Sequence, residues 1–295
     1  MTATPDRLAP APASLAQADL DHYEENGYVV FRDVLSPDEV QAVSSAMTRV
    51  VLEALDGLEL GTYGRRDGRP DSNHNMSGGV LFDKESRFSV QLESAVDPTT
   101  LDATTAPVSY RKLANFIGKD PAFAALEDHP RLKGYRDALL GPDSIRFQDM
   151  ALSKPAHIGV AKPWHQDNAY FSVTPLDQVM GIWIAIDDAT VENGCMHVIP
   201  TARRDLTAHK HIHRTDCEIA EDDLPLDRAK AIEVPAGGAL FFLGMLPHFT
   251  PVNRSPHGRR ALQLHYRGAD TVNRPAEEYN EVFATPDGRP ASCSA

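Results

Sequence analysis

Cysteine, positive charge and long apolar runs are all scarce in this sequence. The three cysteines, Cys195, Cys217 and Cys293, are far apart and odd in number, which suits a reducing compartment and provides no CxxC pair for zinc. The chain has 29 lysines and arginines but 42 acidic residues. Its net charge of −13 disfavours nucleic acid or an anionic membrane as partner. The chain has no run of about 18 apolar residues and no apolar N-terminal signal. These absences together predict a cytoplasmic protein.

The length and composition favour one large domain. With 295 residues and 42% hydrophobic side chains, the chain can bury a full core, and β-rich domains of this size are often undivided. Residues 1–13, rich in Pro, Ala and Thr, are expected to form a disordered leader before a single domain at 14–295. Within this domain we expect N-terminal helices at about 14–140, a jelly-roll core at about 144–267 and a loosely held polar tail at 274–295.

Helical signals dominate the first half of the chain. Ser36, followed by Pro37 and by Glu39 three residues on, is a strong helix start, and an apolar stripe comes after it. Such a stripe packs on a core, so we expect this helix to cover one face of a sheet. The other elements expected here are helices at 15–26, 108–118 and 121–140 and a strand at 28–34.

Short strands separated by Gly, Pro and Asn turns dominate the second half. In the strand expected at 178–187, one face carries large apolar residues, while the other carries Gly181, Trp183 and Ala185 and leaves room for a ligand. Many strands after helices predict a mainly β fold with helical cover (α+β) and a double-stranded β-helix core, the jelly roll of cupin-like proteins. The expected strands are 144–153, 178–187, 195–200, 231–234, 238–243 and 259–267.

A polar, glycine-rich stretch at 57–79 interrupts the first half. Loops of this length without secondary structure are usually functional lids or disordered segments. His74 and Asn75 within it are candidates for contact with a substrate, and a solvated loop is an equally good interpretation.

Two potential metal ligands, His165 and Asp167, lie one residue apart in the stretch KPWHQDNAYF at 162–171. In an extended segment their side chains point the same way and can share an ion. Composition alone predicts about one H-x-D by chance, so the motif gains weight only with His248, which lies beside a proline-rich turn. Two His and one carboxylate with open positions form the facial triad of non-haem Fe(II) oxygenases.

Three segments of the sequence resemble a known family. WHQD at 164–167, ENGCMHVIP at 192–200 and PAGGALFF…PHFTPVNRS…RRAL at 235–262 are similar, in this order, to the phytanoyl-CoA dioxygenase family of Fe(II)/2-oxoglutarate oxygenases. The resemblance runs from about residue 21 to residue 267. It implies that His165, Asp167 and His248 bind Fe(II), and that 2-oxoglutarate and O2 are cosubstrates.

The resemblance also assigns residues to 2-oxoglutarate. Arg259, 11 residues after His248, matches the family's arginine that grips the far carboxylate, and a guanidinium can do so with two parallel hydrogen bonds. Thr250, Gln148 and Trp183 match positions that line the same pocket, with a structural role as the alternative for each.

Arg260 is the competing arginine, because only one of two successive residues on a strand can face the interior. Arg259 shares its face with the small and polar residues Ala261, Gln263 and His265, which suit a wet cavity. Arg260 shares its face with an apolar set that should pack under the covering helices, namely Leu262, Leu264 and Tyr266. We therefore expect Arg259 to point inward and Arg260 outward.

The family chemistry implies oxidation of a small-molecule metabolite, coupled to decarboxylation of 2-oxoglutarate to succinate and CO2. Hydroxylation is the default outcome, and desaturation, ring closure and epimerisation stay open because the fold does not choose among them. In a related halogenating subgroup Gly or Ala replaces the carboxylate so that halide can bind iron, so Asp167 argues against halogenation. The acidic composition hints at a polar or amine-bearing, cationic substrate, and the oligomeric state stays open.

Two rival interpretations are a non-catalytic binding barrel and a cupin-type metalloprotein that does not use 2-oxoglutarate. The presence of His165, Asp167 and His248 together with Arg259 counts against the first. Arg259 counts against the second, since a cupin would not need a carboxylate clamp at that position. The cluster His209, His211 and His213 suggests a second metal, but no matching carboxylate or Cys spacing accompanies it. A solvated charged loop is the favoured interpretation of this cluster.

Overall fold

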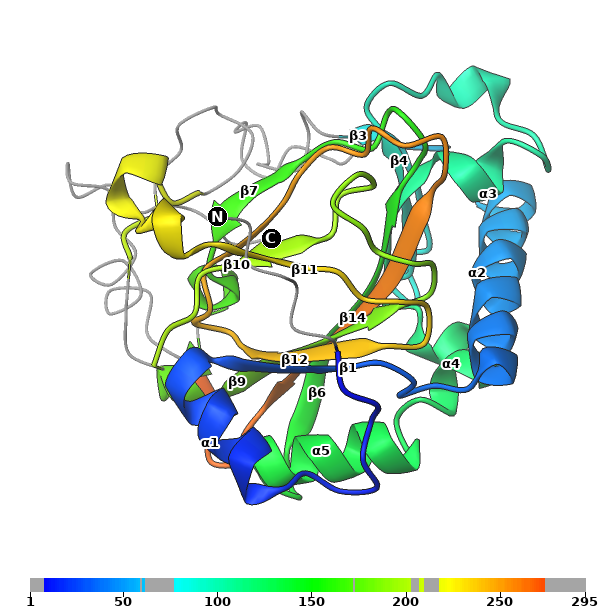
Figure 1. Ribbon diagram of the computed structural model, residues 1–295. Helices are drawn as coiled ribbons and strands as arrows, with labels where there is room; N and C mark the ends of the chain where they lie inside the picture. The colour runs from blue at the N-terminus through cyan, green and yellow to red at the C-terminus, as the bar shows by residue number, and fades with distance from the viewer. Residues whose placement is uncertain are drawn as a thin grey trace.

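The computed structural model describes residues 8–58, 60–61, 77–171, 173–202, 207–209 and 218–273. Two antiparallel sheets form the body of the molecule, with helices outside the larger one (Figure 1). Four candidate residues, His74, Asn75, His211 and His213, lie outside the described residues, as does the tail at 274–295.

The larger sheet has nine strands in the described part of the chain, and every neighbouring pair is antiparallel. The strand order is β1-β12-β9-β14-β6-β5-β4-β3-β2. The strands are β1 (Tyr28–Phe31), β2 (Leu60–Gly61), β3 (Ser77–Phe82), β4 (Ser89–Glu93), β5 (Tyr110–Ala114), β6 (Ile145–Lys154), β9 (Val179–Ala185), β12 (Ala239–Leu243) and β14 (Arg259–Arg267).

The smaller sheet has the order β11-β10-β13-β7 and supplies the opposite wall of the cavity described below. The described strands form separate sheets, so the predicted jelly roll consists of two open sheets and is not a closed barrel. A further pair joins β8 to β15. These strands are β7 (Lys162–His165), β8 (Val173–Thr174), β10 (Met196–Val198), β11 (Lys230–Ile232), β13 (His248–Thr250) and β15 (Val272–Asn273).

Helices cover the outer face of the larger sheet, with α2 and α5 prominent in Figure 1. None of the described helices has the length and apolar character needed to cross a membrane. The helices are α1 (Gln17–Asn26), α2 (Pro37–Gly57), α3 (Ala106–Ser109), α4 (Pro121–Ala124) and α5 (Pro130–Leu140). Short 3-10 turns are η2 (Pro98–Thr100), η3 (Ile117–Lys119), η4 (Asp167–Tyr170), η5 (Leu176–Gln178), η6 (Glu221–Asp223) and η7 (Leu226–Arg228).

Helix α2 begins where the sequence predicts. The Ser36 hydroxyl accepts a hydrogen bond from the Glu39 amide at 3.3 Å, and the Glu39 carboxylate accepts one from the Ser36 amide at 2.8 Å. The apolar stripe of the helix, including Met47 and Val50, is buried in the outer core. Each such side chain stabilises the fold by roughly 1.5–3 kcal/mol when fully buried.

Strict alternation along β9 and β14 separates the outer core from the cavity. Ile182 and Ile184 of β9 pack in the outer core, whereas Trp183 between them lines the cavity. On β14, Leu262 and Leu264 face the outer core, and Gln263 faces the cavity. The apolar and small-or-polar faces predicted for both strands are therefore confirmed.

Three expectations for the N-terminal region are wrong. Residues 8–13 are not a disordered leader, because the amide of Ala11 donates to the Arg32 carbonyl at 2.9 Å and the Arg32 amide donates to the Ala9 carbonyl at 3.0 Å. The helix expected at 108–118 is the short α3 followed by β5, whose backbone pairs with β4 and β6. The helix expected at 121–140 is two helices, because Pro130 begins α5 and cannot continue a preceding turn.

Candidate active site

Two histidines meet where strands β7 and β13 of the smaller sheet pair. His165 and His248 are direct partners in the antiparallel register, and their ring centroids are 4.1 Å apart. Nδ1 of His165 is 2.7 Å from the Pro163 carbonyl oxygen, and Nδ1 of His248 is 2.9 Å from the Leu246 carbonyl oxygen. Each carbonyl accepts a hydrogen bond from the Nδ1–H group, so Nε2 of each ring is left as a ligand atom.

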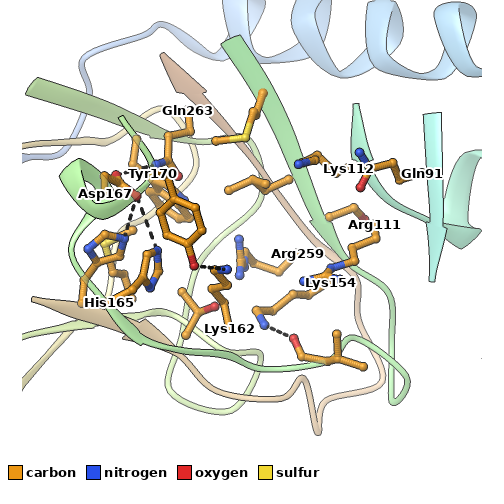
Figure 2. A pocket seen from close by; sticks show the side chains of 18 of the residues that line it. Gln91, Arg111, Lys112, Lys154, Lys162, His165, Asp167, Tyr170, Arg259 and Gln263 are labelled. Atoms are coloured by element: carbon orange, nitrogen blue, oxygen red, sulfur yellow. Dashed lines mark hydrogen bonds and ion pairs between the residues drawn. The ribbon is translucent and has the colours of Figure 1, made fainter. Parts of the chain in front are cut away.

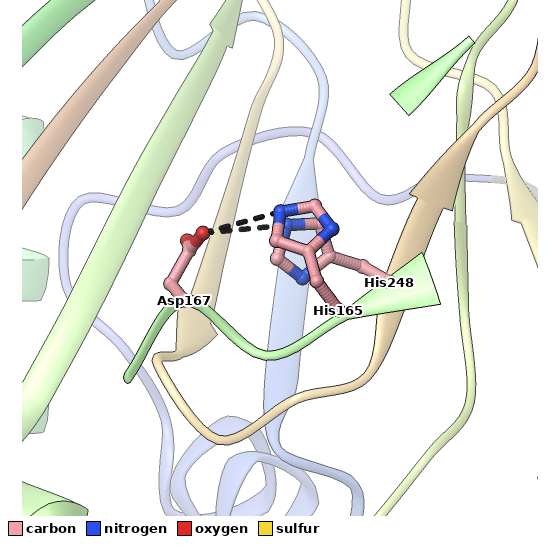
Figure 3. A group of neighbouring side chains, drawn as sticks. All are labelled: His165, Asp167 and His248. Atoms are coloured by element: carbon pink, nitrogen blue, oxygen red, sulfur yellow. Dashed lines mark ion pairs between the residues drawn. The ribbon is translucent and has the colours of Figure 1, made fainter. Parts of the chain in front are cut away.

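Asp167 joins the two rings from the turn that follows β7. Gln166 keeps an extended backbone, and Asp167 begins the 3-10 turn η4, so the strand expected to carry both ligands in fact ends at His165. One Asp167 oxygen lies 3.4 Å from Nε2 of His165 and 3.7 Å from Nε2 of His248 (Figure 3). The ligand atoms of these three buried residues, which we term the ligand cluster, lie within 4.8 Å of one another.

The second Asp167 oxygen, Oδ2, is held by two side chains of β14. Nε2 of Gln263 donates to it at 3.1 Å, and Nε2 of His265 lies 2.8 Å from it. Burial acts to raise the pKa of Asp167, but the neighbouring His248 and His265 and the hydrogen bonds hold that pKa well below its ordinary value. The carboxylate is therefore ionised, with Oδ1 directed at the histidines.

Burial, followed by the nearby His165, lowers the pKa of His248 to about 3. His248 is therefore a neutral imidazole near neutral pH, which is the protonation state that binds a metal. Two imidazoles and one carboxylate supply nitrogen and oxygen donors in the set that non-haem iron takes. The residues present thus fit an Fe(II) ion on their own chemistry.

His209 is a supporting residue whose role the sequence did not reveal. It is fully buried rather than solvated, and its Nε2 accepts a hydrogen bond from the Gln166 amide at 2.9 Å. Its Nδ1 lies 2.9 Å from the Thr207 carbonyl oxygen. His209 therefore fixes the backbone between His165 and Asp167, and the interpretation of this residue as part of a solvated loop is wrong.

Arg259 and Arg260 point in opposite directions, as the strand alternation predicts. Arg259 is 1% exposed and lines the cavity, where its guanidinium lies 5.4 Å from the Trp183 ring and Nη2 donates to the Gly194 carbonyl at 3.1 Å. Within the described part of the chain, Nε and Nη1 of Arg259 have no hydrogen-bond partner. Arg260 instead forms two hydrogen bonds of 2.8 Å with the Asp187 carboxylate.

The other three residues that the sequence assigned to a cosubstrate also line the cavity. They are Trp183 on β9, Gln148 on β6 and Thr250 on β13. Nε1 of Trp183 and Oε1 of Gln148 are buried and lack a hydrogen-bond partner among the described residues. Buried polar groups without partners are uncommon, and a polar ligand in the cavity would satisfy them.

The cavity that joins these residues lies between the two sheets and has a volume of about 280 Å³. This volume is near the lower end of the range for small-molecule sites. His165 and Asp167 lie on one side of it, and Arg111, Lys112 and Lys154 lie on the other, with Arg259 between them (Figure 2). We term Arg111, Lys112 and Lys154 the cationic wall.

Residues 23–261 match the family profile described as Phytanoyl-CoA dioxygenase (PhyH). The chain belongs to the phytanoyl-CoA dioxygenase family. The mouse (Mus musculus) protein named phytanoyl-CoA dioxygenase domain-containing protein 1 is 25% identical over 300 residues, which cover 93% of this chain and 97% of the relative. A homologue of that protein in Caenorhabditis briggsae is 28% identical over 265 residues, which cover 83% of this chain and 88% of the relative.

Solved structures confirm the fold expected for a phytanoyl-CoA dioxygenase family member. The non-heme alpha-ketoglutarate-dependent carbocyclase SnoK of nogalamycin biosynthesis has a TM-score of 0.62 at 23% identity, with 90% of each chain covered. EctD from S. alaskensis, solved with 2-oxoglutarate and 5-hydroxyectoine, has a TM-score of 0.61 at 20% identity, with 98% of this chain and 89% of that chain covered. Family membership also confirms the predicted class, a non-haem Fe(II)/2-oxoglutarate-dependent oxygenase.

Proposed function

We propose that this member of the phytanoyl-CoA dioxygenase family oxidises, and by default hydroxylates, a small-molecule metabolite at an Fe(II) ion held by His165, Asp167 and His248. The observation that supports this proposal most directly is the convergence of three buried ligand atoms within 4.8 Å of one another. When bound, Fe(II) with 2-oxoglutarate and O2 would supply the oxidising power, with succinate and CO2 as coproducts.

The chain's own residues hold the ligands in place and exclude competing groups. The Pro163 and Leu246 carbonyls fix the two imidazoles, while Gln263 and His265 fix the outer oxygen of Asp167. A carboxylate at position 167 occupies the place that a halide would need, so the proposal is oxygenation rather than halogenation.

Arg259 is the proposed partner of the far carboxylate of 2-oxoglutarate. Burial lowers the pKa of Arg259 only to about 10, so the guanidinium remains charged at neutral pH. Its Nε and Nη1, which have no hydrogen-bond partner among the described residues, are available for charge-assisted hydrogen bonds. Thr250, Gln148 and Trp183 are proposed to line the same cosubstrate site, since all three lie in the cavity wall.

Other outcomes of the same oxidation remain alternatives to hydroxylation. SnoK is described as a carbocyclase and SnoN as an epimerase, and both share this fold at 23% and 19% identity. The fold therefore does not choose the product. The ligand cluster together with Arg259 counts against a binding barrel, and a cupin-type metalloprotein without 2-oxoglutarate would not need a carboxylate clamp at Arg259. A cytoplasmic location remains a proposal that the widely separated cysteines support.

The test is to load the purified protein with Fe(II) and 2-oxoglutarate without oxygen and to record the visible absorption band of the iron chelate. Succinate formation is then measured after oxygen is admitted, with and without a panel of candidate substrates. We expect the band in the wild type and its loss in the His165→Ala variant. A protein that binds 2-oxoglutarate without iron, or gives no chelate band, would contradict the proposal.

A further inference from the structure

Among the described residues that line the cavity, cationic side chains outnumber carboxylates, although the whole protein is acidic. The net charge of the chain is −13, yet five cationic side chains and two carboxylates lie among the described residues that line the cavity. The cations are the cationic wall together with Lys162 and Arg259, and the carboxylates are Glu93 and Asp167. The overall acidity favours a cationic substrate, whereas the cationic side chains that line the cavity favour an anionic one.

A distortion in β5 turns two neighbouring cations into the cavity. In a regular strand Arg111 and Lys112 would face opposite sides of the sheet. Lys112 pairs with Gln91 and Tyr110 pairs with Leu92, so the register shifts and Arg111 is the extra residue of a bulge. Tyr110 and Leu113, three residues apart, accordingly both lie in the outer core, while Arg111 and Lys112 both line the cavity.

A second pair of cations is opposed across two neighbouring strands. Lys154 at the end of β6 is the direct register partner of Arg259 on β14, and these residues are only 6% and 1% exposed. Like charges directly opposite each other in a sheet are destabilising. Burial, then Arg259 and Arg111, hold the pKa of Lys154 well below its ordinary value. Its ammonium donates to the Val160 carbonyl, which supplies a hydrogen bond but no opposite charge.

The proposed cofactors do not remove this excess of positive charge. Fe(II) and the 2-oxoglutarate dianion carry equal and opposite charges, so together they leave the balance of the cavity unchanged. Protonation of Glu93 would increase the excess, and loss of a proton from Lys154 would reduce it by a single charge without reversing its sign. A cavity lined by an excess of cationic side chains attracts a negatively charged ligand, which can accept charge-assisted hydrogen bonds from them.

We propose that the substrate is an organic anion whose carboxylate, phosphate or sulfate group binds Arg111 and Lys112 while the rest of the molecule extends toward the ligand cluster. This inference rests on the proposed function and adds the substrate class to it. The cationic wall and the ligand cluster lie on opposite sides of the cavity (Figure 2). The reacting carbon of the substrate is therefore separated from its charged group. Arg259 remains the partner of 2-oxoglutarate.

The experiment uses matched probes on the protein loaded with Fe(II) and 2-oxoglutarate without oxygen. The two members of each pair share one carbon skeleton, and one is anionic while the other is neutral. One pair is a carboxylic acid and its primary amide, and the other is a phosphate monoester and its parent alcohol. Binding is measured by calorimetry and by the rise in melting temperature, and the acid and phosphate arms distinguish the two kinds of anion. We expect at least one anionic probe to bind about tenfold or more tightly than its neutral partner.

Variants then locate the charged group. Arg111→Gln and Lys112→Gln should each weaken the anionic probe by about tenfold, leave the neutral probe unchanged and shift 2-oxoglutarate affinity by less than about twofold. Lys230→Gln is the control, because Lys230 is an exposed cation of β11 outside the cavity. If the melting temperature of Arg111→Gln shows misfolding, Lys112→Gln alone carries the test.

Three outcomes would overturn the inference. One is equal binding of the charged and neutral probes, or no binding of any anion at millimolar concentration. Another is a loss of 2-oxoglutarate affinity in Arg111→Gln and Lys112→Gln with unchanged anion binding, which would assign both cations to the cosubstrate. Failure of the wild type to form the iron chelate would instead overturn the proposed function, and the substrate class with it.

Discussion

The ligand cluster and the cationic wall occupy opposite sides of one cavity, but they are built in different ways. The ligand cluster comes from the paired strands β7 and β13 of the smaller sheet, whose register places the two histidines, and from the turn after β7, which places Asp167. The cationic wall comes from β5 and β6 of the larger sheet and includes a bulge. Metal binding requires fixed atom positions, whereas attraction between charges persists over several ångströms. Substitutions in the ligand cluster should therefore abolish metal binding, whereas substitutions in the cationic wall should reduce anion affinity by degrees.

The largest effect is expected from His248→Ala, which tests the all-or-none side of this comparison. Loss of an outer partner of a metal ligand already costs roughly 10- to 100-fold in metal affinity, so loss of a ligand itself should reduce affinity further and abolish turnover. The measurement is iron content after dialysis, with succinate formation as a second readout. His197→Ala on β10 is the matched control, since His197 is a half-buried histidine outside the cavity. Retained iron and turnover in His248→Ala would remove this residue from the cluster.

The next effect separates two adjacent arginines on β14. Removal of the buried partner of a carboxylate costs on the order of 2 to 5 kcal/mol, so Arg259→Ala should weaken 2-oxoglutarate by tens to thousands of fold. Arg260→Ala should leave that affinity unchanged and instead lower stability by about 1 kcal/mol, because it breaks the partly exposed pair with Asp187. Titration of 2-oxoglutarate and urea unfolding of both variants check this contrast. The reverse ranking would place Arg260 at the cosubstrate.

The sequence predicts the proximity of His165 and Asp167 and the orientation of Arg259 because both depend on short-range patterns, whereas the third ligand, His248, is assigned through the family resemblance. The spacing of His165 and Asp167 and the alternation along β14 can be read without knowledge of neighbouring strands. The cationic wall could not be found in this way. Residues 108–118 carry no regular period of two, because the bulge at Arg111 breaks the alternation, and the sequence therefore predicts a helix where the structure has a strand.

Pairing between distant strands explains the remaining differences. The opposition of Lys154 and Arg259 depends on β6 lying beside β14, which no local pattern specifies. His209 is buried only because its segment reaches the backbone at Gln166, 43 residues earlier in the chain. A histidine in a polar stretch carries no signal of that contact. Neither a motif nor a hydrophobic period predicts these two tertiary contacts. One places two cations side by side in the cavity wall, and the other holds the backbone before the turn that carries Asp167.

A smaller effect is expected from Gln263→Leu, which keeps the size of the side chain and removes its hydrogen bond to Asp167. The bond of 3.1 Å helps hold the outer oxygen of Asp167, so its loss should weaken iron binding by roughly 10-fold without changing 2-oxoglutarate affinity at saturating iron. Metal titration monitored by the chelate band checks both values. Met150→Leu, another change in the cavity wall, is the control. Equal iron affinity in both variants would show that Gln263 packs beside the ligand cluster without orienting it.

The smallest effect is a graded dependence of anion binding on pH, which is the behaviour expected of the cationic wall and not of the ligand cluster. Burial raises the pKa of Glu93 above its ordinary value of 4.5, against the opposing influence of Arg111 and Lys154. Burial also lowers the pKa of Lys154 below its ordinary value of 10.5, with Arg259 and Arg111 acting in the same direction and Glu93 opposing them. As the pH rises between these two ordinary values, Glu93 gains a negative charge and Lys154 loses a positive one.

Both titrations remove positive charge from the cavity, so the affinity for a carboxylic acid probe should fall by a few-fold at each step as the pH rises. The probe itself has an ordinary pKa of about 4 and is already ionised in this window. Calorimetric titration across the window, with the matched amide as control, measures the effect, and the amide should show no trend. Glu93→Gln should bind the acid more tightly and lose the lower step, while the step due to Lys154 remains. Acid affinity that increases with pH would show that these two groups do not set the charge of the cavity.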